Sequence, residues 1–396
     1  MTRRPRQDSG TTDVIERQDF TVLFDALAER GYRLVGPTVR EGVVVYDDIT
    51  SSAELPVGYV DEQEKGTYRL IPGAGQALFG CGMGPHTWKK YLFPPKLRLW
   101  GAECTNGTFA LTSTPADPAD AQPLALIGVR ACELAAIAIQ DRILMGGDAI
   151  DPHYKARREH LFIVAVNCVH PENTCFCASM NTGPRVASGF DLSLTEVIEP
   201  ERHFFVVQSG SDAGAAVLAS VPHHSATREE KDAADTLIAQ AAEQMGRNVN
   251  TKGLKELLAR STESPHWDAI AARCLACGNC TMVCPTCFCM TVEDTTDLSG
   301  EHAERWRMWD SCFTTDFSYV IGGSVRPSVK SRYRQWLTHK FSTWIDQFGM
   351  SGCVGCGRCI TWCPAEIDIT EEVRALQAQS TAEGDGTGRK RKDAHA

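Results

Sequence analysis

The chain has 396 residues, which is enough for two or three domains with hydrophobic cores. Its hydrophobic fraction of 43% is typical of a globular protein, and its formal net charge of −10 argues against nucleic acid as a partner. The strongest apolar run, Leu161–Val166, is far too short for a membrane span, so we expect a soluble protein.

The sequence contains 17 cysteines. In a small secreted chain such a number would indicate disulfides. At this length, and with no N-terminal signal segment, it indicates metal ligands in a reducing cytoplasm. We therefore expect a cytoplasmic protein that binds metal through thiolates.

The first predicted elements are a helix and two strands. The helix starts after Asp19 and ends at Gly31, because the apolar residues between them fall on one face. Strand-like segments follow at Arg33–Val35 and Val43–Tyr46.

A strand–helix–strand unit is predicted further along the N-terminal half. Leu124–Val129 and Leu161–Val166 are the continuous apolar runs of buried strands, and Cys132–Leu144 between them has helical periodicity. Another strand is expected around Val206. These elements predict an α/β domain over residues 1–226.

Four cysteines are predicted to meet at one edge of this domain. The loops that leave two parallel strands of a right-handed unit lie side by side, and Cys132 and Cys168 follow the two strands. A short loop can then bring Cys175 and Cys177 back over them. The four thiols are candidate ligands of an iron–sulfur cube or of zinc. Alternatively, they are buried packing residues.

A second, mainly helical domain is predicted over residues 227–376. The run Thr227-Arg-Glu-Glu230 is a capping box that starts a helix with a stop at Gly246. Ser264-Pro265 begins a shorter helix that leads into a cysteine-rich loop.

The same cysteine pattern occurs twice in this second domain. The copies are Cys274-Leu-Ala-Cys277-Gly-Asn-Cys280-Thr-Met-Val-Cys284-Pro285 and Cys353-Val-Gly-Cys356-Gly-Arg-Cys359-Ile-Thr-Trp-Cys363-Pro364. Each is the C-x2-C-x2-C-x3-C-P run of two-cluster bacterial ferredoxins, in which three thiolates bind one [4Fe–4S] cube and the fourth binds the other. Two runs therefore predict two cubes in a ferredoxin-type domain.

Crossed ligation assigns eight cysteines to these two cubes. The predicted ligands of the first cube are Cys274, Cys277, Cys280 and Cys363. Those of the second cube are Cys284, Cys353, Cys356 and Cys359. Zinc is the alternative metal, but one zinc ion needs four ligands and would leave half of the thiols idle.

A long insertion, residues 290–350, separates the two motifs. Its second half, Ser328–Phe348, has apolar residues at i, i+3 and i+4 spacing, which predicts an amphipathic helix. The fold class is therefore α+β, in which an N-terminal α/β domain precedes a dicluster ferredoxin-type domain with a long helical insertion. Residues 377–396 are predicted to be a disordered tail.

Three further cysteines lie near the motifs without belonging to them. Cys287, Cys289 and Cys312 are interpreted as small, buried, inert side chains that shield the cubes. Cys81 and Cys104 are not assigned as ligands either.

Several longer segments have a familiar sequence. They are Gly84–Pro95, Arg130–Glu133, Asn167–Cys177, His302–Phe313 and Ser331–Lys340, together with both cysteine motifs. In these segments the chain resembles the beta subunit of cytoplasmic sulfhydrogenases, which are bidirectional NAD(P)-linked [NiFe] hydrogenases. The same family includes the electron-transfer subunit of anaerobic sulfite reductase. The resemblance covers most of the chain.

The resemblance implies an electron-transfer subunit of a hetero-oligomer. Its partners would be the small and large subunits of a [NiFe] hydrogenase, together with a flavin- and NAD(P)-binding diaphorase subunit. No catalytic residue is expected in this chain, because no paired C-x-x-C ligand set for nickel occurs elsewhere, and Gly73-Ala-Gly75 does not continue as a dinucleotide loop.

The implied role in electron transfer favours one metal over the other for the N-terminal cysteines. A relay has more use for a redox centre than for zinc, so Cys132, Cys168, Cys175 and Cys177 are expected to hold a third [4Fe–4S] cube. Two other functions stay open. One is the electron-transfer subunit of an anaerobic sulfite or sulfur reductase, and the other is a structural zinc protein.

Overall fold

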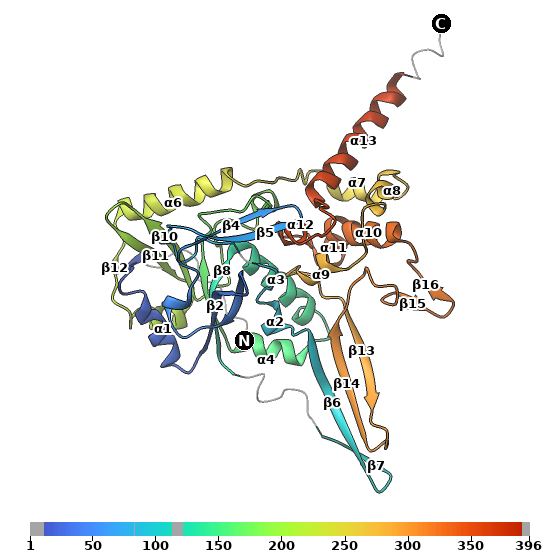
Figure 1. The fold of residues 1–396 in the computed structure, drawn as a ribbon, viewed down its shortest axis with the longest axis horizontal. Helices are drawn as coiled ribbons and strands as arrows, with labels where there is room; N and C mark the ends of the chain where they lie inside the picture. Colours follow the sequence, from blue (N-terminus) through green and yellow to red (C-terminus); the bar gives the residue numbers. More distant parts are fainter. Residues whose placement is uncertain (1–11, 83, 113–121, 390–396) are drawn as a thin grey trace.

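The N-terminal half is built on a mixed eight-stranded sheet in the computed structural model, which describes residues 12–82, 84–112 and 122–389 (Figure 1). The strand order is β12-β1-β11-β10-β9-β8-β2-β3. The four strands from β10 to β2 are parallel to one another, and the remaining pairs are antiparallel. The strands are β1 Thr12–Glu16, β2 Arg33–Arg40, β3 Val43–Asp48, β8 Leu124–Arg130, β9 Leu161–Val166, β10 Leu192–Ile198, β11 His203–Ser209 and β12 His224–Ser225.

Helices cover both faces of this sheet. Side chains alternate between faces along each strand, so Phe162 and Val164 enter one core while Ile163 enters the other. Helices α1 and α5 pack on the first face, and helices α3, α4 and α6 pack on the second. The helices are α1 Thr21–Ala28, α3 Ala131–Met145, α4 Pro152–Glu159, α5 Asp212–Leu218 and α6 Arg228–Glu243.

The predicted strand–helix–strand unit is present. Strands β8 and β9 are parallel neighbours, and helix α3 connects them together with the additional helix α4. Cys132 therefore lies in the first turn of α3, and Cys168 is the second residue after β9. Both cysteines lie at the carboxyl edge of the parallel strands.

Helix α6 packs against strands β10 and β11, although the predicted domain boundary at residue 227 separates it from them. Its Ala234 shares a small core with Val197 and Val206. The capping box of Thr227 and Glu230 does start this helix, as predicted. A capping box fixes where a helix begins but carries no information about the surface on which the helix packs.

In the C-terminal half, mostly short helices surround the two cysteine motifs. The predicted helix at Ser328–Phe348 is present as α10 and α11, which a π-helical turn at His339–Thr343 connects. The helices are α7 Leu254–Arg260, α8 His266–Ala271, α9 Asn279–Met282, α10 Val329–Thr338, α11 Trp344–Phe348, α12 Arg358–Thr361 and α13 Ile369–Arg389.

The prediction of a helical insertion is wrong for its first half. Residues 290–309 form the hairpin of β13 Met290–Thr296 and β14 His302–Trp309. Strand β14 also pairs with β6 Lys96–Thr105, which pairs with β7 Thr108–Leu111, and this four-stranded ribbon projects from the body (Figure 1). Strand β6 lies far from β14 in sequence, so no local pattern could predict that pairing.

Two smaller hairpins complete the strands. They are β4 Tyr59–Glu64 with β5 Thr67–Pro72, and β15 Tyr319–Val320 with β16 Gly323–Ser324. The first hairpin reaches the second cysteine motif, where Gly66 N–H donates a 3.1 Å hydrogen bond to the Ile360 carbonyl. Tyr68 on the same hairpin stacks on Trp362.

The C-terminal tail differs from the prediction as far as it is described. Helix α13 continues to Arg389, so residues 377–389 are helical, and the remaining tail lies outside the described residues. Ile369, Val373 and Leu376 anchor the first turns of α13 in the core, and a helix that is already nucleated extends at little cost. Across the described ranges, no helix is both long and apolar enough to cross a membrane.

Candidate metal centres

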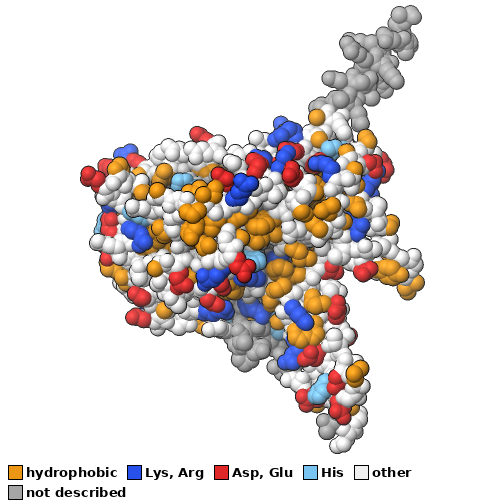
Figure 2. Space-filling model, in the orientation of Figure 1, with side chains coloured by type: hydrophobic (Ala, Val, Ile, Leu, Met, Phe, Trp, Pro, Cys, Tyr) orange, Lys and Arg blue, Asp and Glu red, His pale blue; other side chains and the backbone are white. Residues whose placement is uncertain are grey.

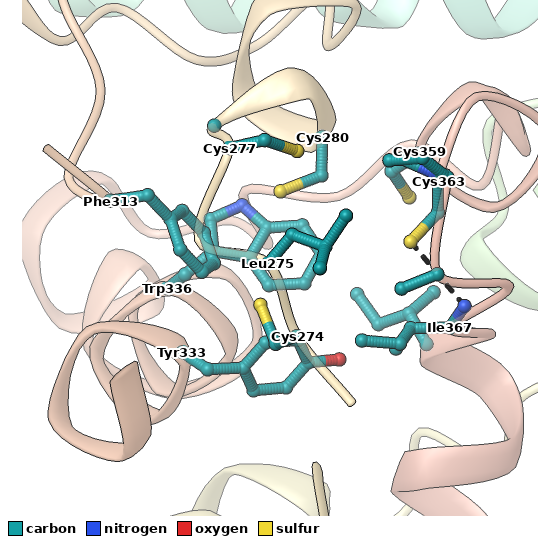
Figure 3. Close-up of a pocket in the computed structure, with 14 residues that line it drawn as sticks. Cys274, Leu275, Cys277, Cys280, Phe313, Tyr333, Trp336, Cys359, Cys363 and Ile367 are labelled. Carbon is teal, nitrogen blue, oxygen red and sulfur yellow. Dashed lines mark hydrogen bonds between the residues drawn. The ribbon is translucent and has the colours of Figure 1, made fainter. Parts of the chain in front are cut away.

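The four cysteines predicted for the first cube line one cavity. The loop before α9 and the first turn of α9 supply Cys274, Cys277 and Cys280. The segment that follows α12 supplies Cys363 (Figure 3). The Asn279 side chain donates a 2.5 Å hydrogen bond to the Trp362 carbonyl, which ties the two loops together. Cys359 also lines this cavity, so the assignment of the individual ligands stays a prediction.

Polar atoms without partners face this first cavity. Tyr333 and Trp336 of helix α10 line it, and their Oη and Nε1 atoms are buried with no hydrogen-bond partner among the described residues. Buried polar groups normally have partners. Sulfides of an iron–sulfur cube accept hydrogen bonds, so these two donors fit such a group.

The four cysteines predicted for the second cube also lie together. Burial and the neighbouring thiols of Cys353, Cys356 and Cys284 raise the pKa of Cys359. The loop that carries three of them turns tightly, and the Gly355 N–H donates a 3.4 Å hydrogen bond to Cys353 Sγ. Backbone N–H groups directed at ligand sulfur are typical of iron–sulfur loops.

A second cavity contains all four cysteines of the predicted third site. Cys132, Cys168, Cys175 and Cys177 line it. Burial raises the pKa of Cys177 to about 12, so a bound metal would have to displace the protons of these thiols. The guanidinium of Arg130 lines the same cavity, and its Nη1 atom is buried without a partner in the described part of the chain. This donor set fits an anionic metal centre.

The third cysteine set adjoins the second. Phe176 N–H donates a 2.9 Å hydrogen bond to the Gly355 carbonyl, and Thr182 Oγ1 donates a 2.6 Å bond to the Val354 carbonyl. Cys356 of the second set lines the cavity of the third. The second set therefore adjoins the first set through Cys359, which lines the first cavity, and the third set through Cys356.

Comparison with known proteins bears on the two cysteine motifs and on the chain as a whole. Residues 273–367, which contain both cysteine motifs, match the family described as 4Fe-4S dicluster domain. We refer to this segment as the dicluster domain. Over 373 residues the chain is 29% identical to sulfhydrogenase 2 subunit beta of Pyrococcus furiosus, and the match covers 90% of this chain and 96% of that protein. The resemblance to sulfhydrogenase beta subunits is thereby confirmed.

A buried ion pair connects the dicluster domain to the third site. Arg358, which precedes Cys359, donates a 2.6 Å hydrogen bond to the carboxylate of Glu133, which follows Cys132. Tyr46 also donates to Glu133, at 2.6 Å. Removing one partner of a buried pair typically costs about 3–5 kcal/mol. Sequence reasoning missed Arg358, because 225 positions separate it from Glu133.

The three cysteines of the dicluster domain outside the two motifs lie in contact pairs. A hydrogen bond between the side chains of Cys289 and Cys312 lowers the pKa of Cys289 to about 7. Cys287 makes a similar contact with Cys284. In the part of the chain that the structure describes, no three His, Cys, Asp or Glu side chains are close enough to hold a single metal ion. Cys81 and Cys104 line neither of the two cavities.

Proposed function

We propose that this chain is the electron-transfer subunit of a cytoplasmic NAD(P)-linked [NiFe] hydrogenase. It would relay electrons between a flavin-containing subunit that oxidises NAD(P)H and the hydrogenase small and large subunits. The single observation that carries this proposal is the series of three cysteine sets. Each set has thiols for one [4Fe–4S] cube, and adjacent sets share contacts.

The cubes would supply one-electron transfer, and the chain's own residues would hold them close together. Asn279 ties the loops of the first site, and Thr182 and Phe176 fix the third site against the second. Electrons could therefore enter at one end of the series and leave at the other. The first site reaches the surface, because Cys277 and Leu275 are exposed. Hydrophobic side chains also gather on the face of the molecule that Figure 2 shows.

Composition of the native complex tests the proposal. We expect anaerobic purification with this chain as bait to yield nickel, flavin, iron and acid-labile sulfide, and to yield H2-dependent reduction of NAD(P). Siroheme without nickel would contradict a hydrogenase and identify the related sulfite-reducing complex. Zinc without labile sulfide would contradict electron transfer altogether.

A further inference from the structure

Two buried lysines flank the second cysteine set. Lys340 is 3% exposed, and its Nζ lies 3.2 Å from Cys284 Sγ. Lys89 is 2% exposed and donates hydrogen bonds to the carbonyls of Cys284 and Cys287, at 3.0 and 3.1 Å. The two lysines come from opposite halves of the sequence and meet at one ligand.

Neither lysine forms an ion pair with a carboxylate within the described ranges. Lys89 has the ring of Trp309 at 3.9 Å, and Lys340 has the hydroxyl of Thr286 and the carbonyl of Gly352 at 3.3 and 3.4 Å. These neutral groups solvate an ammonium only in part. A buried charge without a counter-charge is costly, so the position of Lys340 requires an anion close to Cys284.

The backbone of Lys340 also contacts the loop of the second cysteine set. Lys340 belongs to the π-helical turn between α10 and α11, a local distortion that often occurs at functional sites. Its carbonyl accepts a 2.8 Å hydrogen bond from Gly352 N–H, directly before Cys353. The residue therefore contacts both segments that supply ligands to the second set.

Among the described residues, no lysine or arginine lines the cavity of the first set, and the charges of Arg332 and Lys340 act on its Cys274 and Cys280 only from outside that lining. The residues that line its cavity are cysteines, glycine, proline and apolar or aromatic side chains, and none of them is charged. The donors near a cube in that cavity would be neutral: the side chains of Tyr333 and Trp336, and the backbone N–H groups that donate to Cys274 and Cys363 Sγ at 3.4 Å. The two sites of the dicluster domain thus differ in local charge.

We propose that Lys340 is the buried counter-cation of the second cube and holds its reduction potential above that of the first cube. The inference rests on the proposed function, since it requires the second cube to be present. Reduction adds one electron to a group that four thiolates already make anionic. A cation beside Cys284 stabilises the reduced form more than the oxidised form, and burial limits screening by solvent.

An EPR-monitored redox titration of the full chain carrying Lys340→Met tests this role. We expect the ratio of reduced to oxidised second cube at a fixed potential to fall by about tenfold or more, which is about 59 mV for one electron. The first cube should shift less. Lys330→Met is the matched control, because Lys330 lies on α10 and pairs with Asp268 at the surface, and both midpoints should stay unchanged.

The possible results distinguish an effect of the Lys340 charge from an effect of its packing. If Lys340→Met retains its iron and the second midpoint does not move, the proposal is overturned. If Lys340→Met loses the second cube, Lys340→Arg decides: retention of the cube supports a requirement for charge, and loss of the cube overturns it. A wild-type chain without iron and labile sulfide would instead overturn the proposed function, before any variant is compared.

Discussion

Cys363 belongs to the second motif in sequence and lines the cavity of the first motif in space. We expect Cys363→Ser to lose the first cube, with about four iron atoms fewer per chain, and to retain the spectrum of the second. Iron analysis together with EPR would measure this. Cys104→Ser on the projecting ribbon is the control and should leave the iron content unchanged. Loss of the second cube instead would show that the ligands do not cross.

Cys287, Cys289 and Cys312 are predicted to bind no cube. Their thiols contact one another or Cys284, and they line neither of the two cavities that hold the first and third sets. Individual replacements by Ser should therefore leave iron and labile sulfide at the wild-type level in anaerobically purified protein. A variant that lacks about four iron atoms would contradict this interpretation of the residue concerned.

The sequence predicts the role of the motif cysteines much better than it predicts the roles of the residues around them. Fixed spacing identifies the two motifs, because one loop supplies three ligands to one cube. Lys340, Arg358 and Glu133 give no such local signal, since each acts on a group that is distant in sequence. Their roles follow only from burial and from the partners that the fold brings to them.

At the scale of elements, the loop of Gly355 makes a close contact between the second and third sites. Gly355 has a φ of +66°, and a Cβ there would lie 2.7 Å from backbone atoms of Cys177 and Phe176. We expect Gly355→Ala to destabilise the chain by about 1–3 kcal/mol through overpacking, beyond the left-handed backbone cost of about 1–2 kcal/mol. Thermal unfolding of the anaerobic protein would measure the loss.

Gly253→Ala provides a matched control for that variant. Gly253 has a φ of +68° and no atom within 4 Å of the position of a Cβ, so it isolates the backbone cost from the contact. Equal destabilisation in the two variants would contradict close packing between the two sites.

Elements with a local signal were predictable, and elements with a distant partner were not. The strands β8 and β9 and the helix between them follow from apolar runs and periodicity, and the structure contains all three. The pairing of β14 with β6 joins residues from the two halves of the chain, and the Gly355 contact does the same. Such pairing depends on the whole fold rather than on the residues of one segment.

At the scale of the whole molecule, the two halves interlock around the three cysteine sets. The β6–β14 pairing, the Glu133–Arg358 ion pair and the Phe176–Gly355 hydrogen bond all cross between them. The Lys89 side chain of the N-terminal half also reaches the Cys284 carbonyl in the dicluster domain. Under the proposed function, the N-terminal half is therefore part of the relay as well as its support.

The number of cubes per chain tests this account most directly. Full-length protein, purified anaerobically and reconstituted, should contain about 12 iron and 12 labile sulfide per chain, four of each for every cube. A Cys168→Ser/Cys177→Ser variant should contain about 8 of each and should retain both signals of the dicluster domain. A wild-type chain with about 8 of each, unchanged in that variant, would contradict a three-cube relay.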